Sequence, residues 1–190
     1  MLTIRDAKPS DAPFLAECIL AGMHFYDFED VLSDDMTEFL ECITECEGRE
    51  DTLYSWKNTR LAEVDGTPAG ALLSYPGEWY MKLRDKTFRK YWPAFFTVQP
   101  ESDPEADPGE YYLDSLAVHL DYRKQGIGRA LLEDGIIKGA SLGFKRISII
   151  AETEYPHLVQ YYESLGFVPA DHRQVFGTDF QRLIYTIAEN

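Results

Sequence analysis

The stretch from Tyr122 to Leu132 (YRKQGIGRALL) contains the residue types of this chain that are best suited to binding chemistry. Gly126 and Gly128 carry no side chain, so the backbone there can come close to a bound group. The amides of such a turn, together with those of the first helical residues, favour an anion. Three basic side chains lie in the same stretch: Arg123, Lys124 and Arg129. The pattern therefore predicts a cradle for a diphosphate group.

Two better-known phosphate-binding loops do not fit this stretch. A Walker A loop has Lys and then Ser or Thr after its last glycine, whereas Arg129 and Ala130 follow Gly128. A dinucleotide-binding fingerprint has a third glycine, and Leu131 stands at that position. A plain strand–turn–helix junction is the alternative interpretation, and the residues that flank the loop argue against it.

The flanking residues carry a resemblance to a known family. The order Leu116-Ala117-Val118, then Tyr122-Arg123-x-x-Gly126-x-Gly128, then Ala130-Leu131-Leu132 resembles the acetyl-CoA signature of the GNAT-superfamily N-acetyltransferases. A second element, YYESLGF at 161–167, is similar to the Leu-Tyr-x-x-x-Gly-Phe segment of that family. The resemblance implies a mixed α/β fold with a central, mostly antiparallel, twisted sheet of about six to seven strands flanked by helices. We expect one such domain over residues 1–190, with an insertion at about 75–110.

The resemblance also implies a co-substrate, acetyl-CoA, and no metal. It places the backbone of Leu116 and Val118 beside the pantetheine arm, on a strand that separates from its neighbour, while the side chains of these two residues pack in the core. It assigns the diphosphate to the loop, with these cofactor-binding candidates: Arg123, Lys124, Gln125, Gly126, Ile127, Gly128, Arg129 and Ala130.

Tyr162 matches the tyrosine of the second family element and is the candidate general acid. A phenol has a pKa of about 10 and can give its proton to a departing thiolate. The alternative is that Tyr161 and Tyr162 only pack a helix against the sheet. The family usually has Asn and Ala seven and four residues before this Tyr. Tyr155 and Leu158 occupy these two positions. Tyr155 or His157 would then replace the cofactor contact that the Asn makes in the family.

Asp114 is the candidate general base. By the two-residue alternation of a strand it shares a face with Leu116 and Val118, and Tyr112 lies on that face too. The alternative role for Asp114 is to cap a neighbouring loop. His119 is expected on the opposite face and carries little weight.

The hydrophobic pattern indicates the elements that position these residues. Expected strands lie around Leu2 and Ile4, over 59–64 and 69–74 around an Asp65-Gly66 turn, and over 111–118, 145–151, 167–176 and 180–187, the last two joined through 177–179. Expected helices begin near Ser10 or Asp11, run from Ser33 to Gly48, include a short helix lined by Trp79 and Trp92, and cover 128–142 and 156–165. The proline-rich segment 100–109 is expected to be a loop.

Composition limits the function classes. The net charge is −15 over 190 residues, which argues against nucleic acid or an anionic membrane as a partner. Eleven carboxylates lie between residues 27 and 51, and five between 101 and 110. Most of these carboxylates are expected on solvated faces. The second interpretation is that together they create a negative electrostatic field that attracts a cationic amine. Three cysteines without a disulfide framework, and no apolar run long enough to cross a membrane, predict a cytoplasmic protein.

The sequence thus predicts an N-acetyltransferase that moves an acetyl group from acetyl-CoA to a primary amine by direct transfer in a ternary complex. The acceptor is expected to be a small cationic molecule or a protein amine. The alternative is a non-catalytic acyl-CoA-binding sensor or interaction module. Dimers are common among related proteins, so both a homodimer and a monomer are compatible with the sequence. Candidate walls of the acceptor pocket are His24, Tyr26, Glu29, Glu78 and Trp79.

Overall fold

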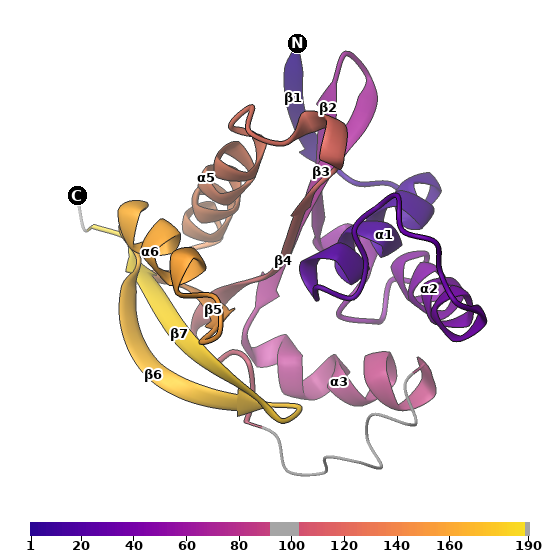
Figure 1. Cartoon of the computed structure of the whole chain (residues 1–190). Helices are drawn as coiled ribbons and strands as arrows, with labels where there is room; N and C mark the ends of the chain where they lie inside the picture. The colour runs from indigo at the N-terminus through magenta and orange to yellow at the C-terminus, as the bar shows by residue number, and fades with distance from the viewer. Residues whose placement is uncertain (92–102, 189–190) are drawn as a thin grey trace. The chain divides into compact units, whose positions relative to one another are not determined.

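The computed structural model of the chain describes residues 1–91 and 103–188 (Figure 1). Two predictions fall partly outside this range: the position of Trp92 on the short helix, and residues 100–102 of the proline-rich loop. No helix of the described part is long and apolar enough to cross a membrane.

Seven strands form one mixed sheet among the described residues. They are β1 (Leu2–Asp6), β2 (Thr59–Val64), β3 (Thr67–Pro76), β4 (Glu110–Val118), β5 (Arg146–Glu152), β6 (Val168–Val175) and β7 (Thr178–Thr186). The strands are ordered β1-β2-β3-β4-β5-β7-β6. β4 and β5 pair in parallel, whereas β1–β2, β2–β3, β5–β7 and β6–β7 are antiparallel. The predicted mixed, mostly antiparallel α/β fold is confirmed.

The helices lie close to their expected positions. They are α1 (Ala12–Gly22), α2 (Asp34–Glu47), α3 (Glu78–Tyr91), α5 (Ile127–Ser141) and α6 (Pro156–Ser164). Ser33 caps α2 as expected, since its hydroxyl accepts a hydrogen bond from the Met36 amide at 3.3 Å. Asp11 precedes α1 but does not cap it. Its carboxylate accepts instead from the Lys8 amide at 2.8 Å and from the Arg5 guanidinium at 2.7 Å.

Two tight turns show how local sequence sets the strand ends. Asp65 and Gly66 both have positive φ, 50° and 83°, which suits the two-residue turn between β2 and β3. The last hairpin reverses at Phe176 and Gly177, with φ of 47° and 84°, and not over 177–179. Thr178 already pairs with Val175, so β7 begins two residues earlier than the sequence predicted.

The chain divides into two compact units, which we describe separately. The first contains Met1–Ser74 and Ser115–Ile136, and the second contains Tyr75–Asp114 and Ile137–Asn190. The first therefore holds the glycine-containing loop at the start of α5, and the second holds α3, α6 and the β6–β7 hairpin.

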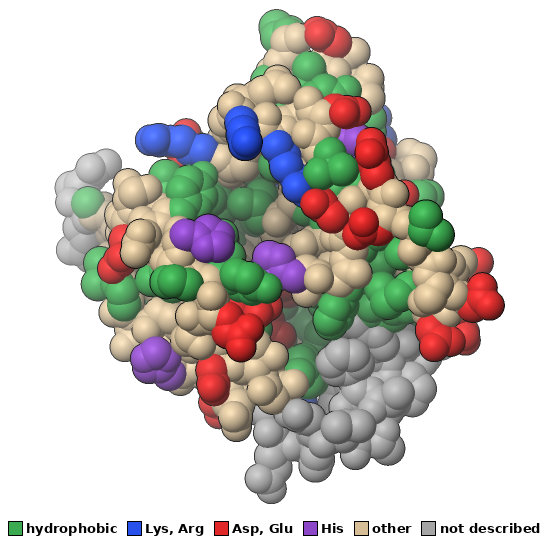
Figure 2. Space-filling view, in the orientation of Figure 1, with side chains coloured by type: hydrophobic (Ala, Val, Ile, Leu, Met, Phe, Trp, Pro, Cys, Tyr) green, Lys and Arg blue, Asp and Glu red, His purple; other side chains and the backbone are tan. Residues whose placement is uncertain are grey.

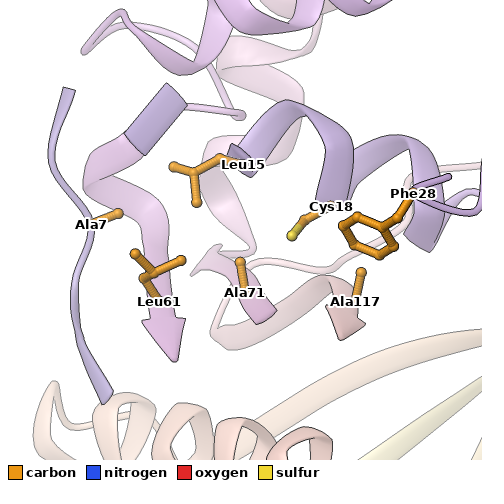
Figure 3. Packing of buried hydrophobic residues seen from close by; sticks show 7 residues of the cluster. All are labelled: Ala7, Leu15, Cys18, Phe28, Leu61, Ala71 and Ala117. Atoms are coloured by element: carbon orange, nitrogen blue, oxygen red, sulfur yellow. The ribbon is translucent and has the colours of Figure 1, made fainter. Parts of the chain in front are cut away.

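A buried apolar cluster organises the first unit (Figure 3). It joins α1, β2, β3 and the end of β4 through residues that share low exposure: Ala7, Leu15, Cys18, Phe28, Leu61, Ala71 and Ala117. The Phe28 ring also lies against the His119 ring, with centroids 4.9 Å apart. Ala117 lies near the end of β4 and His119 directly follows the strand. The cluster therefore holds in place the part of the chain that enters the glycine loop.

A buried ion network organises the second unit. The Arg182 guanidinium on β7 is 3% exposed and donates to the Glu110 carboxylate on β4, a residue that is 0% exposed. The carboxylates of Asp107 and Asp171 form ion pairs with the same guanidinium, and Arg146 forms an ion pair with Glu110 at 2.8 Å. Burying charges in this way is tolerable because each is paired. Glu110 is therefore one of the acids of 101–110 that do not lie on a solvated face, because Arg182 and Arg146 hold it in the interior.

Candidate functional site

The glycine loop connects β4 to α5 within the first unit. After Val118 the chain makes one 3-10 turn over Leu120–Tyr122, and α5 then begins at Ile127. The His119 side chain accepts a hydrogen bond from the Asp121 amide at 3.4 Å, at the start of that turn. Lys124 and Gly126 have positive φ, 61° and 81°, so the backbone changes direction twice just before the helix.

The first turn of α5 presents its amides outward along the helix axis. The Ala130 amide donates to the Gly126 carbonyl at 3.0 Å, and this is the first bond of the helix. The amides of Ile127 and Gly128 precede that bond, at the end of the helix where N–H groups lie before the first intrahelical acceptor. Together with the helix dipole they form a place where an anion is stabilised.

The space at Gly126 fits a group that approaches the backbone. A Cβ built on Gly126 would have nothing within 4 Å, and its φ of 81° is a value that residues with side chains rarely adopt. The open side of the loop can therefore receive a phosphate group.

Gly128 faces inward instead. A Cβ there would lie 3.7 Å from Val118 Cγ2 and 3.9 Å from Leu116 Cδ2, which are ordinary packing distances. The half-buried side chains of Leu116 and Val118 therefore lie beneath the first turn of α5.

The basic side chains of the loop are exposed but are partly engaged by acids. Figure 2 shows basic side chains at the start of α5, and Arg123, Lys124 and Arg129 are all exposed. Arg123 Nε donates to the Val118 carbonyl at 3.0 Å, and its guanidinium pairs with Asp27. Arg129 pairs with Glu133 one turn further along α5, at 2.8 Å. Arg123 therefore ties the connection between α1 and α2 to the loop, which the sequence did not indicate.

Tyr162 lies on α6 in the second unit. Its side chain is buried, at 8% exposure, and its ring contacts those of Tyr161 and Phe167, with centroids 5.7 and 6.1 Å away. Burial, with a smaller contribution from Tyr161, raises the pKa of Tyr162 to about 12. The phenol therefore keeps its proton across the neutral pH range, as a general acid must.

Asp114 lies on β4 in the second unit and is half-buried. Its carboxylate accepts a hydrogen bond from the Tyr75 hydroxyl. Tyr75 is fully buried, and burial together with the charge of Asp114 raises the pKa of that phenol well above its usual value. The hydrogen bond from a neutral phenol thus orients this carboxylate at a half-buried position.

Glu105 is a residue that the sequence reading missed. It lies in the loop before β4, and its carboxylate accepts hydrogen bonds from the Tyr112 hydroxyl at 2.8 Å and the Tyr80 hydroxyl at 3.1 Å. The residue as a whole is half-buried, but its carboxylate is surrounded by protein atoms. This burial, and next the charge of Asp114, raises the pKa of Glu105 to about 8. The available signal was the position of Tyr112 on the same strand face as Asp114.

The remaining predicted residues are spread over the two units. Of the proposed acceptor walls, His24, Tyr26 and Glu29 lie between α1 and α2 in the first unit, whereas Glu78 and Trp79 begin α3 in the second. Tyr26 is engaged locally, since its hydroxyl donates to the Phe28 carbonyl.

The two aromatic residues near the start of α6 lie next to each other. Tyr155 precedes the helix and His157 is in its first turn, with their rings 6.0 Å apart. Both are within the unit that holds Tyr162.

Comparison with known proteins places these features in a family. The model of the acetyltransferase (GNAT) family matches residues 25–167. A mycothiol acetyltransferase from Propionibacterium freudenreichii subsp. shermanii is 37% identical over 67 residues, which are 35% of this chain and 21% of that protein. The chain thus matches about a fifth of the length of that relative.

Two solved structures show the same fold. An N-acetyltransferase from Staphylococcus aureus Mu50 superposes with a TM-score of 0.73 at 22% identity, over 96% of this chain and 99% of the other. A chain of a NatC complex bound to a Gag peptide and CoA superposes with a TM-score of 0.55 at 16% identity, over 98% and 99% of the two chains.

Proposed function

Because this chain belongs to the acetyltransferase (GNAT) family, we propose that it transfers an acetyl group from acetyl-CoA to the nitrogen of a primary amine. The observation that carries the proposal is the loop before α5. Its open position at Gly126 and the outward amides of Ile127–Arg129 suit the diphosphate of coenzyme A.

The loop residues hold the co-substrate in this proposal. The amides from Gln125 to Arg129 bind the diphosphate, whereas the Ala130 amide, a candidate from the sequence, is engaged by the Gly126 carbonyl. Lys124 and Arg129 add positive charge beside the diphosphate. Arg123 contributes by holding the loop to Asp27 and the Val118 carbonyl. The peptide groups of Leu116 and Val118 lie along the pantetheine arm. When bound, acetyl-CoA supplies an acetyl group that is activated as a thioester.

The backbone of β4 supports this placement. The parallel pairing of β4 with β5 runs only from Glu110 with Arg146 to Tyr112 with Ser148, although β5 continues to Glu152. A strand that leaves its neighbour early has peptide groups available to an extended ligand, which can bind as an added strand would.

Tyr162 acts as the proton donor. Its hydroxyl carries a proton at neutral pH because burial raises its pKa to about 12. It donates this proton toward the sulfur of the leaving thiolate, which is a better leaving group when its charge is neutralised.

Asp114 acts as the proton acceptor on the amine side. An alkyl ammonium has a pKa near 10.4, so only about one molecule in 2,500 is neutral at pH 7. Nitrogen cannot attack a thioester until one N–H bond breaks and its electron pair is freed. The carboxylate of Asp114 takes that proton, directly or through water.

A small cationic amine is the acceptor class that the charge favours. The net charge is −15, and Figure 2 shows acidic side chains gathered over α2. A negative field of this kind concentrates cations near the surface and repels anions. A cytoplasmic location and a homodimer stay predictions.

A second candidate is an acyl-CoA sensor without catalysis. One observation favours it: Tyr155 and Leu158 stand where the family usually has Asn and Ala, and the Tyr155 ring lies 6.0 Å from the His157 ring.

The two candidates are separated by measuring binding and turnover on the same preparation. Isothermal titration calorimetry with acetyl-CoA measures binding, and release of free thiol across a panel of amines measures transfer. Transfer that depends on the amine supports the enzyme. Binding without release of thiol supports the sensor, and absence of binding removes both.

A further inference from the structure

Glu105 occupies a prepared position in the second unit. Two hydroxyl groups from different elements, Tyr80 on α3 and Tyr112 on β4, donate to its two carboxylate oxygens at 3.1 and 2.8 Å. Both tyrosines are fully buried, and the next residue, Ala106, is 1% exposed. The loop that the sequence indicated as acidic and solvated thus turns one of its acids inward.

The loop that carries Glu105 is fastened on both sides. On one side the Arg173 guanidinium on β6 donates to the Pro104 carbonyl at 2.9 Å and to the Asp107 carboxylate at 2.8 Å. On the other side the loop lies so close to Gly77 that a Cβ there would be 2.1 Å from the Asp107 carbonyl oxygen. The position of Glu105 is therefore set by the fold.

The groups that face Glu105 come from three elements. α3 contributes Tyr80 and the positive charge of Arg84, and β4 contributes Tyr112 and the negative charge of Asp114. The end of β3 contributes Tyr75, which holds Asp114 and packs on the Tyr112 ring with centroids 5.6 Å apart. Two half-buried carboxylates thus accept hydrogen bonds from three buried phenols.

We propose that Glu105 is a positioning residue for Asp114, and that the proton which Glu105 carries or releases sets how strongly Asp114 attracts the proton of the acceptor ammonium. This inference rests on the proposed transfer to an amine. When Glu105 is neutral, Asp114 is the one negative charge of the pair. When Glu105 is ionised, a second negative charge nearby makes Asp114 more basic.

The proton balance of the step is simple. The N–H bond of the ammonium breaks, its electron pair stays on nitrogen, and the proton bonds to a carboxylate oxygen of Asp114. Glu105 exchanges its own proton with solvent as the pH changes. Because burial and the charge of Asp114 raise the pKa of Glu105, the ionised fraction of Glu105 grows as the pH rises from neutral into the alkaline range.

The first test needs no activity. Protein labelled with ¹³C at the glutamate side-chain carboxyl is titrated by NMR from pH 4 to 10. We expect one glutamate signal to titrate with a midpoint near 8, to be absent in Glu105→Gln, and to move down by about one pH unit in Asp114→Asn. Titration of every glutamate below pH 6, or a midpoint that Asp114→Asn does not move, overturns the proposal.

The second test follows the reaction. We measure kcat/KM for one amine from pH 6.5 to 9.5 in the wild type and in Glu105→Gln. Ionisation of the amine is common to both proteins, so it cancels in their ratio. The ratio of kcat/KM in the wild type to kcat/KM in the variant should rise about threefold as the pH passes 8. This is the effect expected when the pKa of the base, Asp114, rises by about one unit and the proton is about half transferred in the transition state.

A control variant separates this role from a structural one. Glu41→Gln makes the same chemical change at an exposed position on α2, and its ratio to the wild type should not vary with pH. Glu105→Asp, which keeps an ionisable group, should restore part of the rise. If Glu105→Gln is active and the ratio of its kcat/KM to that of the wild type does not change with pH, this inference is overturned but the proposed function is not. Absence of amine-dependent transfer in the wild type overturns the proposed function, while the NMR titration still decides whether the pair is coupled.

Discussion

Replacing Gly126 by Val is the perturbation whose effect the structure defines best. The residue has a φ of 81°, and a Cβ there would meet nothing within 4 Å. Overlap therefore contributes no cost, and strain is the main term. A residue with a Cβ in the left-handed region costs about 1–2 kcal/mol, and more when it is β-branched. For a chain of 190 residues, 2 kcal/mol lowers Tm by less than about 8 °C, so the variant should fold.

The effect on binding should be much larger. The valine side chain would fill the open side of the loop, and relief of the strain would turn the amides of Ile127–Arg129 away from the ligand. A hydrogen bond from an amide to a charged group is worth about 1.5–3 kcal/mol. Loss of two such bonds weakens acetyl-CoA binding roughly 10²–10⁴-fold.

Isothermal titration calorimetry measures this change, and circular dichroism melting confirms that the variant is folded. Gly128→Ala is the matched control, because its Cβ would make only the ordinary contacts with Val118 and Leu116 at 3.7 and 3.9 Å. It should bind acetyl-CoA within a few-fold of the wild type. If folded Gly126→Val also binds as the wild type does, the diphosphate does not occupy this loop and the reasoning is refuted.

Three further predictions concern the second unit. Tyr162→Phe should lower kcat by about 10²–10⁴-fold with an unchanged Kd for acetyl-CoA, in steady-state kinetics and calorimetry; an equal kcat would return Tyr162 to packing alone. Asp114→Asn should lower kcat/KM at neutral pH about 10²-fold and change the acidic limb of the pH–rate profile, and an unaltered profile would place the base elsewhere. Arg182→Met should lower the free energy of unfolding by about 3–5 kcal/mol in urea, because Glu110 stays buried after losing this partner. Arg146→Met, which removes the exposed partner of the same carboxylate, should cost about 1 kcal/mol or less, and equal costs would contradict the network.

The loop and its flanking elements could be predicted from sequence because their signals are local. The strand was expected over 111–118 and is found over Glu110–Val118, and the helix was expected over 128–142 and is found over Ile127–Ser141. β-branched and aromatic residues favour the strand, and two glycines mark the turn that follows it. Such patterns need no information about distant parts of the chain.

The inward position of Glu105 could not be predicted in this way. Its two hydrogen-bond donors are 25 residues before it and 7 after it, and the loop closes because Gly77 lets the backbone of Asp107 approach. Composition describes a segment with many acids as solvated. It does not reveal which carboxylate meets a phenol from another element.

The pairing of Arg123 was hidden for a similar reason. Asp27 is 96 residues away in sequence, and the bond forms because Phe28 packs against His119 at the end of β4. A basic residue beside a glycine turn predicts an anion ligand equally well whether its partner is a phosphate or a carboxylate of the same chain.

Titration of ¹⁵N-labelled protein with acetyl-CoA, followed by amide NMR, tests the central claim most directly. Because the proposed ligands are backbone N–H groups, the signals of residues 125–129 should shift most and saturate together with the calorimetric binding curve. Saturable binding that leaves those amides unshifted, and moves others instead, would contradict the account.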